Sequence, residues 1–195
     1  MHSLTAGETS ANVEELDILL YDGTRMTVGS TTNEEFSKVI EDGGRRADVY
    51  SRLKKLSDRY ADAIRQNFPP IRRRVSGYNL PALLPENDFH VARALVGSEC
   101  TCAIVLEAKV RLVDSPPFRS LLVVGYPDIF AAADNVMVPM PFEPIAVEAL
   151  DDAFIEDMKK KEMHPKVSLM PEGRAWLLVE FGGASKKDAD VSGVA

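Results

Sequence analysis

The sequence has few of the residues that build metal centres and disulfide frameworks: its 195 residues include two cysteines and three histidines. A zinc site needs three or four protein ligands, and no pair among these five residues has finger spacing. A disulfide between Cys100 and Cys102 would be badly strained, because one residue separates them. We therefore expect no metal site and no disulfide. With no export signal in the N-terminal residues, we expect a reducing, cytoplasmic setting.

Excess positive charge and long apolar runs are also lacking. The formal net charge is −7, whereas nucleic-acid binding depends on clustered Lys and Arg, so we expect no nucleic-acid partner. No apolar run approaches the roughly 18 residues that a membrane span needs. The chain also lacks a phosphate-binding P-loop, a Gly-x-Gly-x-x-Gly motif and a Gly-x-Ser-x-Gly nucleophile elbow. A composition of 45% hydrophobic and 27% charged residues is that of a soluble globular protein.

The N-terminal half reads as a hairpin followed by two helices. Residues 15–29 alternate apolar and polar residues around Asp22-Gly23, which predicts a two-residue hairpin turn. A short helix is predicted within 30–44, with Thr32 and Glu35 as a capping box. A longer helix over 47–68 is predicted by one apolar stripe at helical spacing, made of Val49, Leu53, Leu56, Tyr60 and Ile64.

The rest of the chain changes character twice. Residues 71–99 are rich in loops, with one helix expected near 90–96, and residues 101–113 predict an extended strand. The segment "DSPPF" at 114–118 interrupts the pattern and is the expected domain boundary. Beyond it, strands are predicted at 120–126, 144–150 and 175–181, with helices at 127–136 and 151–162 between them. This order predicts an α+β layer, one sheet with helices on one face.

Two segments are candidates for ligand contact. Arg72, Arg73 and Arg74 form either a solvated face or an anion site, which the planar guanidinium suits. The segment Gly97-Ser98-Glu99-Cys100-Thr101 is small, polar and led by glycine, so its backbone N–H groups could approach a planar or anionic ligand. Cys100 and Cys102 would share one face of a strand, and we expect them to be buried packing residues.

The segments "SGYNL" at 76–80 and "ALVGSECTCAIVLEAKVRL" at 94–112 resemble the FAD-linked oxidases of the vanillyl-alcohol oxidase type. The likeness is greatest to the group of glycolate oxidase and D-2-hydroxyglutarate or D-lactate dehydrogenases. That family has a Gly-Tyr-Asn/Asp-Leu segment and then a Gly-Ser-Glu-Gly-Thr turn that leads into a strand. Residues 2–26 are similar to the middle of the family's flavin domain, and 119–183 are similar to the start of its cap.

The resemblance implies a fold and a cofactor. Residues 1–114 would be the second subdomain of a PCMH-type FAD-binding domain, and 115–195 the start of a ferredoxin-like α+β cap. FAD would then be bound by residues carried over from the family's motifs. These are Gly77, Tyr78, Asn79, Gly97, Ser98, Glu99, Thr101 and Ile104.

One position departs from the family. Cys100 stands where the family has glycine, which allows positive φ and a close approach of backbone to flavin. Either the turn shifts, or FAD binding is impaired; a cysteinyl–flavin bond is conceivable. Gly-Ser-Glu is then the remnant of a flavin turn.

The resemblance also implies an internal fragment of an FAD-dependent oxidoreductase that dehydrogenates a small D-2-hydroxy acid such as glycolate, D-lactate or D-2-hydroxyglutarate. The family's phosphate-binding loop precedes the region of His2, and its catalytic histidine follows the region of Ala195, so no catalytic residue is assigned here. We expect the chain to be inactive alone and to bind FAD weakly or not at all. Two alternatives stay open: a fold remnant without enzymatic function, and one chain of a split flavoenzyme that associates with a companion chain or as a homo-oligomer.

Overall fold

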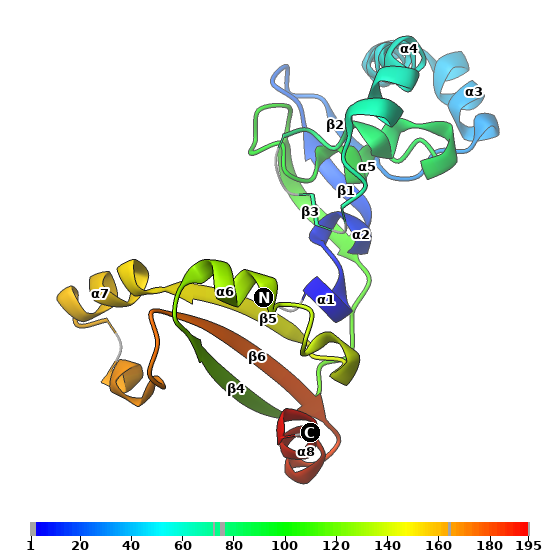
Figure 1. The fold of residues 1–195 in the computed structure, drawn as a ribbon. Coiled ribbons are helices and arrows are strands. Elements are labelled where there is room, and N and C mark those ends of the chain that lie inside the picture. Colours follow the sequence, from blue (N-terminus) through cyan, green and yellow to red (C-terminus); the bar gives the residue numbers. More distant parts are fainter. Residues whose placement is uncertain (1–2, 72, 75–76, 164, 195) are drawn as a thin grey trace. The chain divides into compact units, whose positions relative to one another are not determined.

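The computed structural model describes residues 3–71, 73–74, 77–163 and 165–194 (Figure 1). The chain forms two compact units. The first, here called the N-terminal unit, is Glu8–Leu112, and the second, the C-terminal unit, starts at Val113 and includes the residues up to Gly7. The assignment of residues 1–114 to a partial FAD domain and of 115–195 to a partial cap stays a prediction.

The N-terminal unit packs helices against a three-stranded antiparallel sheet with the strand order β2-β1-β3. Its core joins β1 and β2 to the helices through Val13, Leu16, Val28, Tyr50 and Leu83. The elements of this unit are α2 (Thr9–Asn12), β1 (Val13–Leu19), β2 (Arg25–Val28), α3 (Asn33–Asp42), α4 (Gly44–Asn67), α5 (Val91–Leu95) and β3 (Ile104–Val110), with short 3-10 helices at Leu80–Leu83 and Pro85–Asn87.

The predicted hairpin is confirmed, but its turn is longer than the sequence suggested. The backbone N–H of Leu20 donates to Thr24 O at 2.9 Å, which closes a loop of Tyr21, Asp22 and Gly23. Gly23 has φ +83°, as the last residue of a three-residue hairpin loop commonly does. The Asp22 carboxylate accepts from the backbone N–H of Thr24 at 3.0 Å, and this bond lowers the pKa of Asp22.

Both predicted helices are present, and the capping box of α3 is confirmed. The Thr32 hydroxyl accepts from the backbone N–H of Glu35, and the Glu35 carboxylate accepts from the backbone N–H of Thr32. The stripe predicted for α4 is partly wrong, because Tyr50 and Ser57 are buried while Tyr60 is 46% exposed. The Ser57 hydroxyl donates to Leu83 O at 2.7 Å, and this bond is what allows a polar residue on the buried face.

The C-terminal unit is a second antiparallel sheet with the order β4-β6-β5. Ala175, Leu177, Val179 and Phe181 of the central strand form its core together with Ala132 of α6. The α+β class predicted from the sequence is confirmed at this level, while the PCMH and ferredoxin-like assignments stay predictions. The elements are α1 (Ser3–Ala6), β4 (Phe118–Tyr126), α6 (Ile129–Asp134), β5 (Ala146–Asp151), α7 (Asp152–Lys160), β6 (Ala175–Gly183) and α8 (Lys186–Val194), with 3-10 helices at Met140–Phe142 and Pro165–Leu169.

Candidate functional site

The fold of the N-terminal unit brings the two motif segments of the sequence together. The Tyr78 hydroxyl lies 2.8 Å from Thr101 Oγ1. Since Thr101 Oγ1 itself donates to Ser98 O at 2.6 Å, Tyr78 is the donor in the first bond. A Cβ at Gly97 would lie 3.6 Å from Gly77 O. Residues twenty or more positions apart therefore form one corner of the unit, which we call the motif corner: residues 77–79 and 97–101.

The turn of the motif corner adopts a left-handed backbone at two residues that are not glycine. After Gly97 at φ +87°, Glu99 has φ +50° and Cys100 has φ +60°. Such angles are strained for residues with a Cβ. The turn is held by the backbone N–H of Thr101, which donates to Ser98 O at 2.9 Å, and by the Tyr21 hydroxyl, which donates to Cys100 O at 3.3 Å.

The prediction that both cysteines are buried packing residues is wrong, because Cys100 and Cys102 are both exposed. The strand that was expected to carry them into the core begins only at Ile104, so both residues belong to the turn and its exit. Ala103 is the residue that enters the core, at 4% exposure. The expected alternation of a strand therefore does not apply at these positions.

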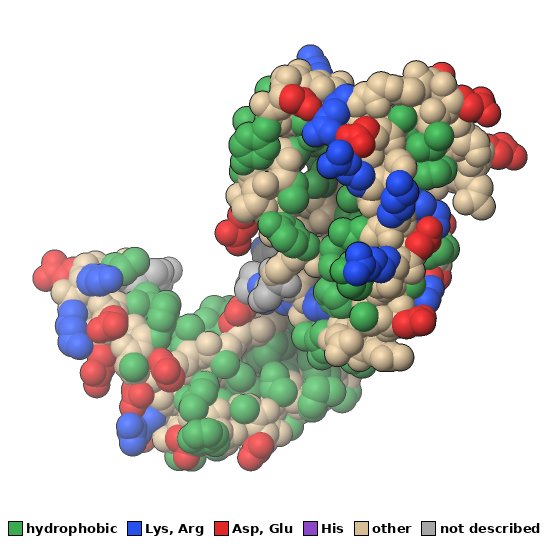
Figure 2. Space-filling model, turned by 90° about the horizontal axis from the view of Figure 1, so that it is seen from above, with side chains coloured by type: hydrophobic (Ala, Val, Ile, Leu, Met, Phe, Trp, Pro, Cys, Tyr) green, Lys and Arg blue, Asp and Glu red, His purple; other side chains and the backbone are tan. Residues whose placement is uncertain are grey.

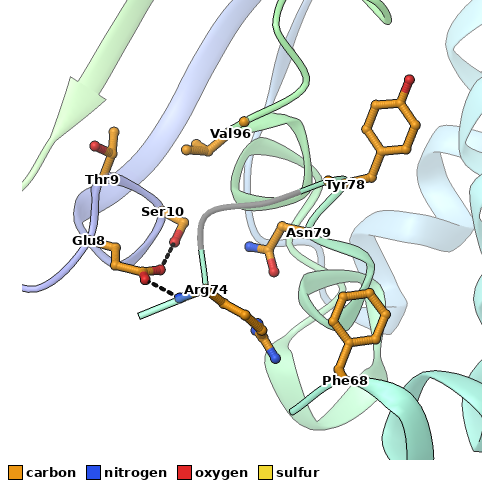
Figure 3. Close-up of a pocket in the computed structure, with 10 residues that line it drawn as sticks. Glu8, Thr9, Ser10, Phe68, Arg74, Tyr78, Asn79 and Val96 are labelled. Carbon is orange, nitrogen blue, oxygen red and sulfur yellow. Dashed lines mark hydrogen bonds between the residues drawn. The ribbon is translucent and has the colours of Figure 1, made fainter. Parts of the chain in front are cut away.

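A small pocket adjoins the motif corner (Figure 3). Its volume is about 120 Å³, and it is lined by residues at the start of α2, in the segment after α4, and in or next to the motif corner. Four of the predicted site residues line it: Gly77, Tyr78, Asn79 and Gly97. Ser98, Glu99, Thr101 and Ile104 do not. The other lining residues are Glu8, Thr9, Ser10, Phe68, Arg74 and Val96.

Glu8 and Arg74 form the part of the pocket that motif reasoning did not identify. One carboxylate oxygen of Glu8 accepts from the backbone N–H of Arg74, and the other accepts from the Ser10 hydroxyl at 3.4 Å. The Arg74 guanidinium stacks over the Phe68 ring at 5.3 Å, so it faces an aromatic surface as well as solvent. The arginine run had pointed to this residue as a possible anion site; Arg72 lies outside the described residues.

Asn79 connects the pocket to α5, the helix that precedes the turn, and His90 caps that helix. The Asn79 amide donates to Arg93 O at 3.1 Å. His90 is buried, and its Nδ1 accepts from the backbone N–H of Arg93 at 3.3 Å, capping α5. Burial lowers the pKa of His90, and the positive charge of Arg93 lowers it further, so the ring is neutral at neutral pH. His2 and His164 lie outside the described residues.

Within the described residues, no group of three or more His, Cys, Asp or Glu side chains could hold a metal ion. In the same part of the chain, no helix is both long and apolar enough to cross a membrane. On the face in Figure 2, acidic and basic side chains are interspersed, with hydrophobic ones exposed between them.

Comparison with known proteins confirms the resemblance of this chain to the FAD-linked oxidase family and, within it, to the 2-hydroxy-acid dehydrogenases. The chain is 27% identical over 150 residues to the D-2-hydroxyglutarate dehydrogenase of Pseudomonas putida, a match that covers 76% of this chain and 15% of the relative. It is 26% identical over 203 residues to the enzyme of the same name from Haemophilus influenzae, covering 96% of this chain and 19% of that protein.

A third relative is the glycolate oxidase subunit GlcD of Bacillus subtilis, 35% identical over 100 residues, which are 49% of this chain and 20% of the relative. No family model matches the chain. The chain spans between 15% and 20% of the length of these relatives.

Proposed function

We propose that the chain carries one part of an FAD-dependent dehydrogenase of a small D-2-hydroxy acid, and that the motif corner is part of its FAD-binding surface. The proposal rests on one observation above all: Tyr78 and Thr101, taken from two separate family motifs, are joined by a hydrogen bond of 2.8 Å. This contact puts the two motifs next to each other, as a shared FAD-binding surface requires. When bound, FAD would supply the acceptor for the hydride that leaves the hydroxy acid.

The residues of the motif corner fit a contact with one side of a flavin cofactor. Gly77 and Gly97 present backbone without a Cβ, and Glu99 and Cys100, which form the left-handed turn, are exposed residues. Such turns are suited to binding planar or anionic groups. The Tyr78 ring is 49% exposed beside them.

The pocket also limits how tightly this chain can hold FAD alone. Pockets that enclose a ligand of drug size measure roughly 300–1,000 Å³, whereas this one measures about 120 Å³. It can therefore enclose only part of a dinucleotide cofactor. We expect weak binding of FAD and, since no catalytic residue is assigned in these 195 residues, no oxidation of hydroxy acids by the chain alone.

The test is a titration of the isotope-labelled chain with FAD, followed by NMR. We expect the amide signals of residues 77–79 and 97–101 to shift, with an affinity that Tyr78→Phe weakens several-fold. Tyr60→Phe is the matched control, since Tyr60 is exposed to a similar degree on α4, at 46%. Absence of shifts at the highest soluble FAD concentration, or shifts confined to other residues, would overturn the assignment of the motif corner.

Enzyme activity is tested separately. The purified chain with added FAD is mixed with glycolate, D-lactate or D-2-hydroxyglutarate and a redox dye. We expect no dye reduction above the rate without hydroxy acid. Dye reduction that depends on the hydroxy acid would show that the chain alone is a complete enzyme, contrary to the proposal.

A further inference from the structure

Strand β3 is the most exposed element of the N-terminal unit's sheet. It lies at one end of the order β2-β1-β3, so among the described residues it has a neighbouring strand on one edge only. All seven of its residues are exposed. Large apolar side chains account for much of this surface: Ile104 is 54% exposed, Leu106 43%, Val110 44% and Leu112, just past the strand, 88%.

An exposed edge of this kind is a template for pairing with another strand. Its backbone N–H and C=O groups point outward at alternate residues, and they gain protein partners when a second strand is added. Charged residues normally protect such edges from uncontrolled association. In β3 the charged residues are Glu107 and Lys109, and their positions suit one particular partner.

The sequence of β3 is complementary to itself. In an antiparallel pair of two β3 strands centred on Ala108, Glu107 of each copy lies opposite Lys109 of the other. In the same register, Leu106 lies opposite Val110, and Ile104 lies opposite Leu112. Glu107 with Lys109 is a pair of unlike charge, and Leu106 with Val110 and Ile104 with Leu112 are apolar on both sides, the two combinations that stabilise neighbouring strands. Val105 opposite Arg111 is the one pair of this register that is neither. Because the register is symmetric, every contact occurs twice except the one between the two Ala108 residues.

Lys109 is free to exchange its present partners. Its Nζ lies 3.5 Å from Glu14 Oε2 and 3.6 Å from Glu15 Oε1, and its side chain is 61% exposed. Contacts this long between exposed groups contribute little to stability. They therefore set no barrier to a contact with Glu107 of another molecule.

We propose that two copies of this chain associate through their β3 edges, centred on Ala108, into one continuous sheet with the strand order β2-β1-β3-β3-β1-β2. The dimer would cover the apolar side chains of Ile104, Leu106, Val110 and Leu112. The inference does not depend on the function proposed above, since no residue of the motif corner is needed for it; of the predicted FAD-binding residues only Ile104 takes part.

The test uses charge reversal in the full chain, with mass measured by light scattering and analytical ultracentrifugation over a range of concentrations. Glu107→Lys places two lysines opposite each other twice in the dimer, and Lys109→Glu does the same with two glutamates. We expect the dissociation constant of the dimer to be about tenfold higher or more in each single variant than in the unaltered chain. Lys55→Glu, the same change on the exposed face of α4, is the control and should leave the dimer unchanged.

Two further measurements distinguish this interface from any other. The double variant Glu107→Lys with Lys109→Glu restores unlike pairs and should again form a dimer. An equimolar mixture of the two single variants should form a heterodimer, because their charges are then complementary across the strand pair. Circular dichroism confirms that each variant is folded.

Three results would overturn the proposal: a monomer at all concentrations, a dimer that neither reversal weakens, or association without a defined mass. A monomer that forms a complex only with a different protein would likewise show that β3 is not an interface between copies of this chain.

Discussion

Replacing Cys100 by glycine should make the chain more stable, although the substitution removes a side chain. Cys100 has φ +60°, and a left-handed conformation costs a residue with a Cβ roughly 1–2 kcal/mol. The thiol is exposed, so its removal gives up little packing. Glycine also destabilises the folded chain by about 0.5–1 kcal/mol, because it has greater freedom in the unfolded chain. The net effect expected for Cys100→Gly is about 0.5–1 kcal/mol of stabilisation.

The assay is reversible unfolding in urea, followed by far-UV circular dichroism, with thermal melting as a second measure. A gain of this size corresponds to a rise in Tm of about 1–4 °C for a chain of this length. Cys100→Ala is the first control, because it removes the thiol and keeps the strain, so its stability should stay close to that of the unaltered chain.

Cys102→Gly is the second control, since Cys102 is also exposed but does not have a positive φ. That variant should lose stability, because glycine adds freedom to the unfolded chain without relieving strain. If Cys100→Gly were neutral or destabilising, or if Cys102→Gly gained as much, the strain assigned to Cys100 would be refuted.

The remaining predictions concern the core and caps of the N-terminal unit. Ser57→Ala should cost about 1–3 kcal/mol, because Leu83 O would lose the hydrogen bond that it accepts inside the core. Urea unfolding measures this cost, and Ser37→Ala on α3 is the exposed control, for which a small cost is expected. Thr32→Ala should cost about 1 kcal/mol by removing the cap of α3, seen in the same assay; a change near zero would contradict the role of the capping box. The pKa of His90 in the folded chain lies below its ordinary value of 6.5. The stability that the neutral ring contributes is therefore complete above pH 6.5 and is lost as the pH falls from 6.5 through the lower pKa of the folded chain. Melting temperatures between pH 8 and pH 5 should therefore fall more for the unaltered chain than for His90→Asn, which keeps a capping side chain without a titrating group; equal slopes would contradict this.

Local patterns in the sequence were sufficient for most of the secondary structure. The capping box at Thr32 and Glu35 and the glycine in the hairpin loop act within a few residues of the chain. Short-range hydrogen bonds and backbone preferences determine such features, so they can be predicted from a few neighbouring residues of the sequence. The resemblance to the FAD-linked oxidases is also visible in the amino-acid sequence alone, since it depends on two short motifs and their order.

Only the tertiary structure determined which residues are buried, which are exposed and which distant residues meet. Ser57 can be buried because its hydroxyl donates a hydrogen bond to the carbonyl of Leu83, 26 positions along the chain. No local sequence pattern identifies that partner. Cys100 and Cys102 are exposed because the strand starts at Ile104, a boundary that depends on pairing with β1. The pocket beside Tyr78 needs Glu8 and Arg74 to meet, and β3 is an edge because of the order in which the strands pair. Contacts between distant residues are selected by packing of the whole unit, which a one-dimensional pattern does not contain.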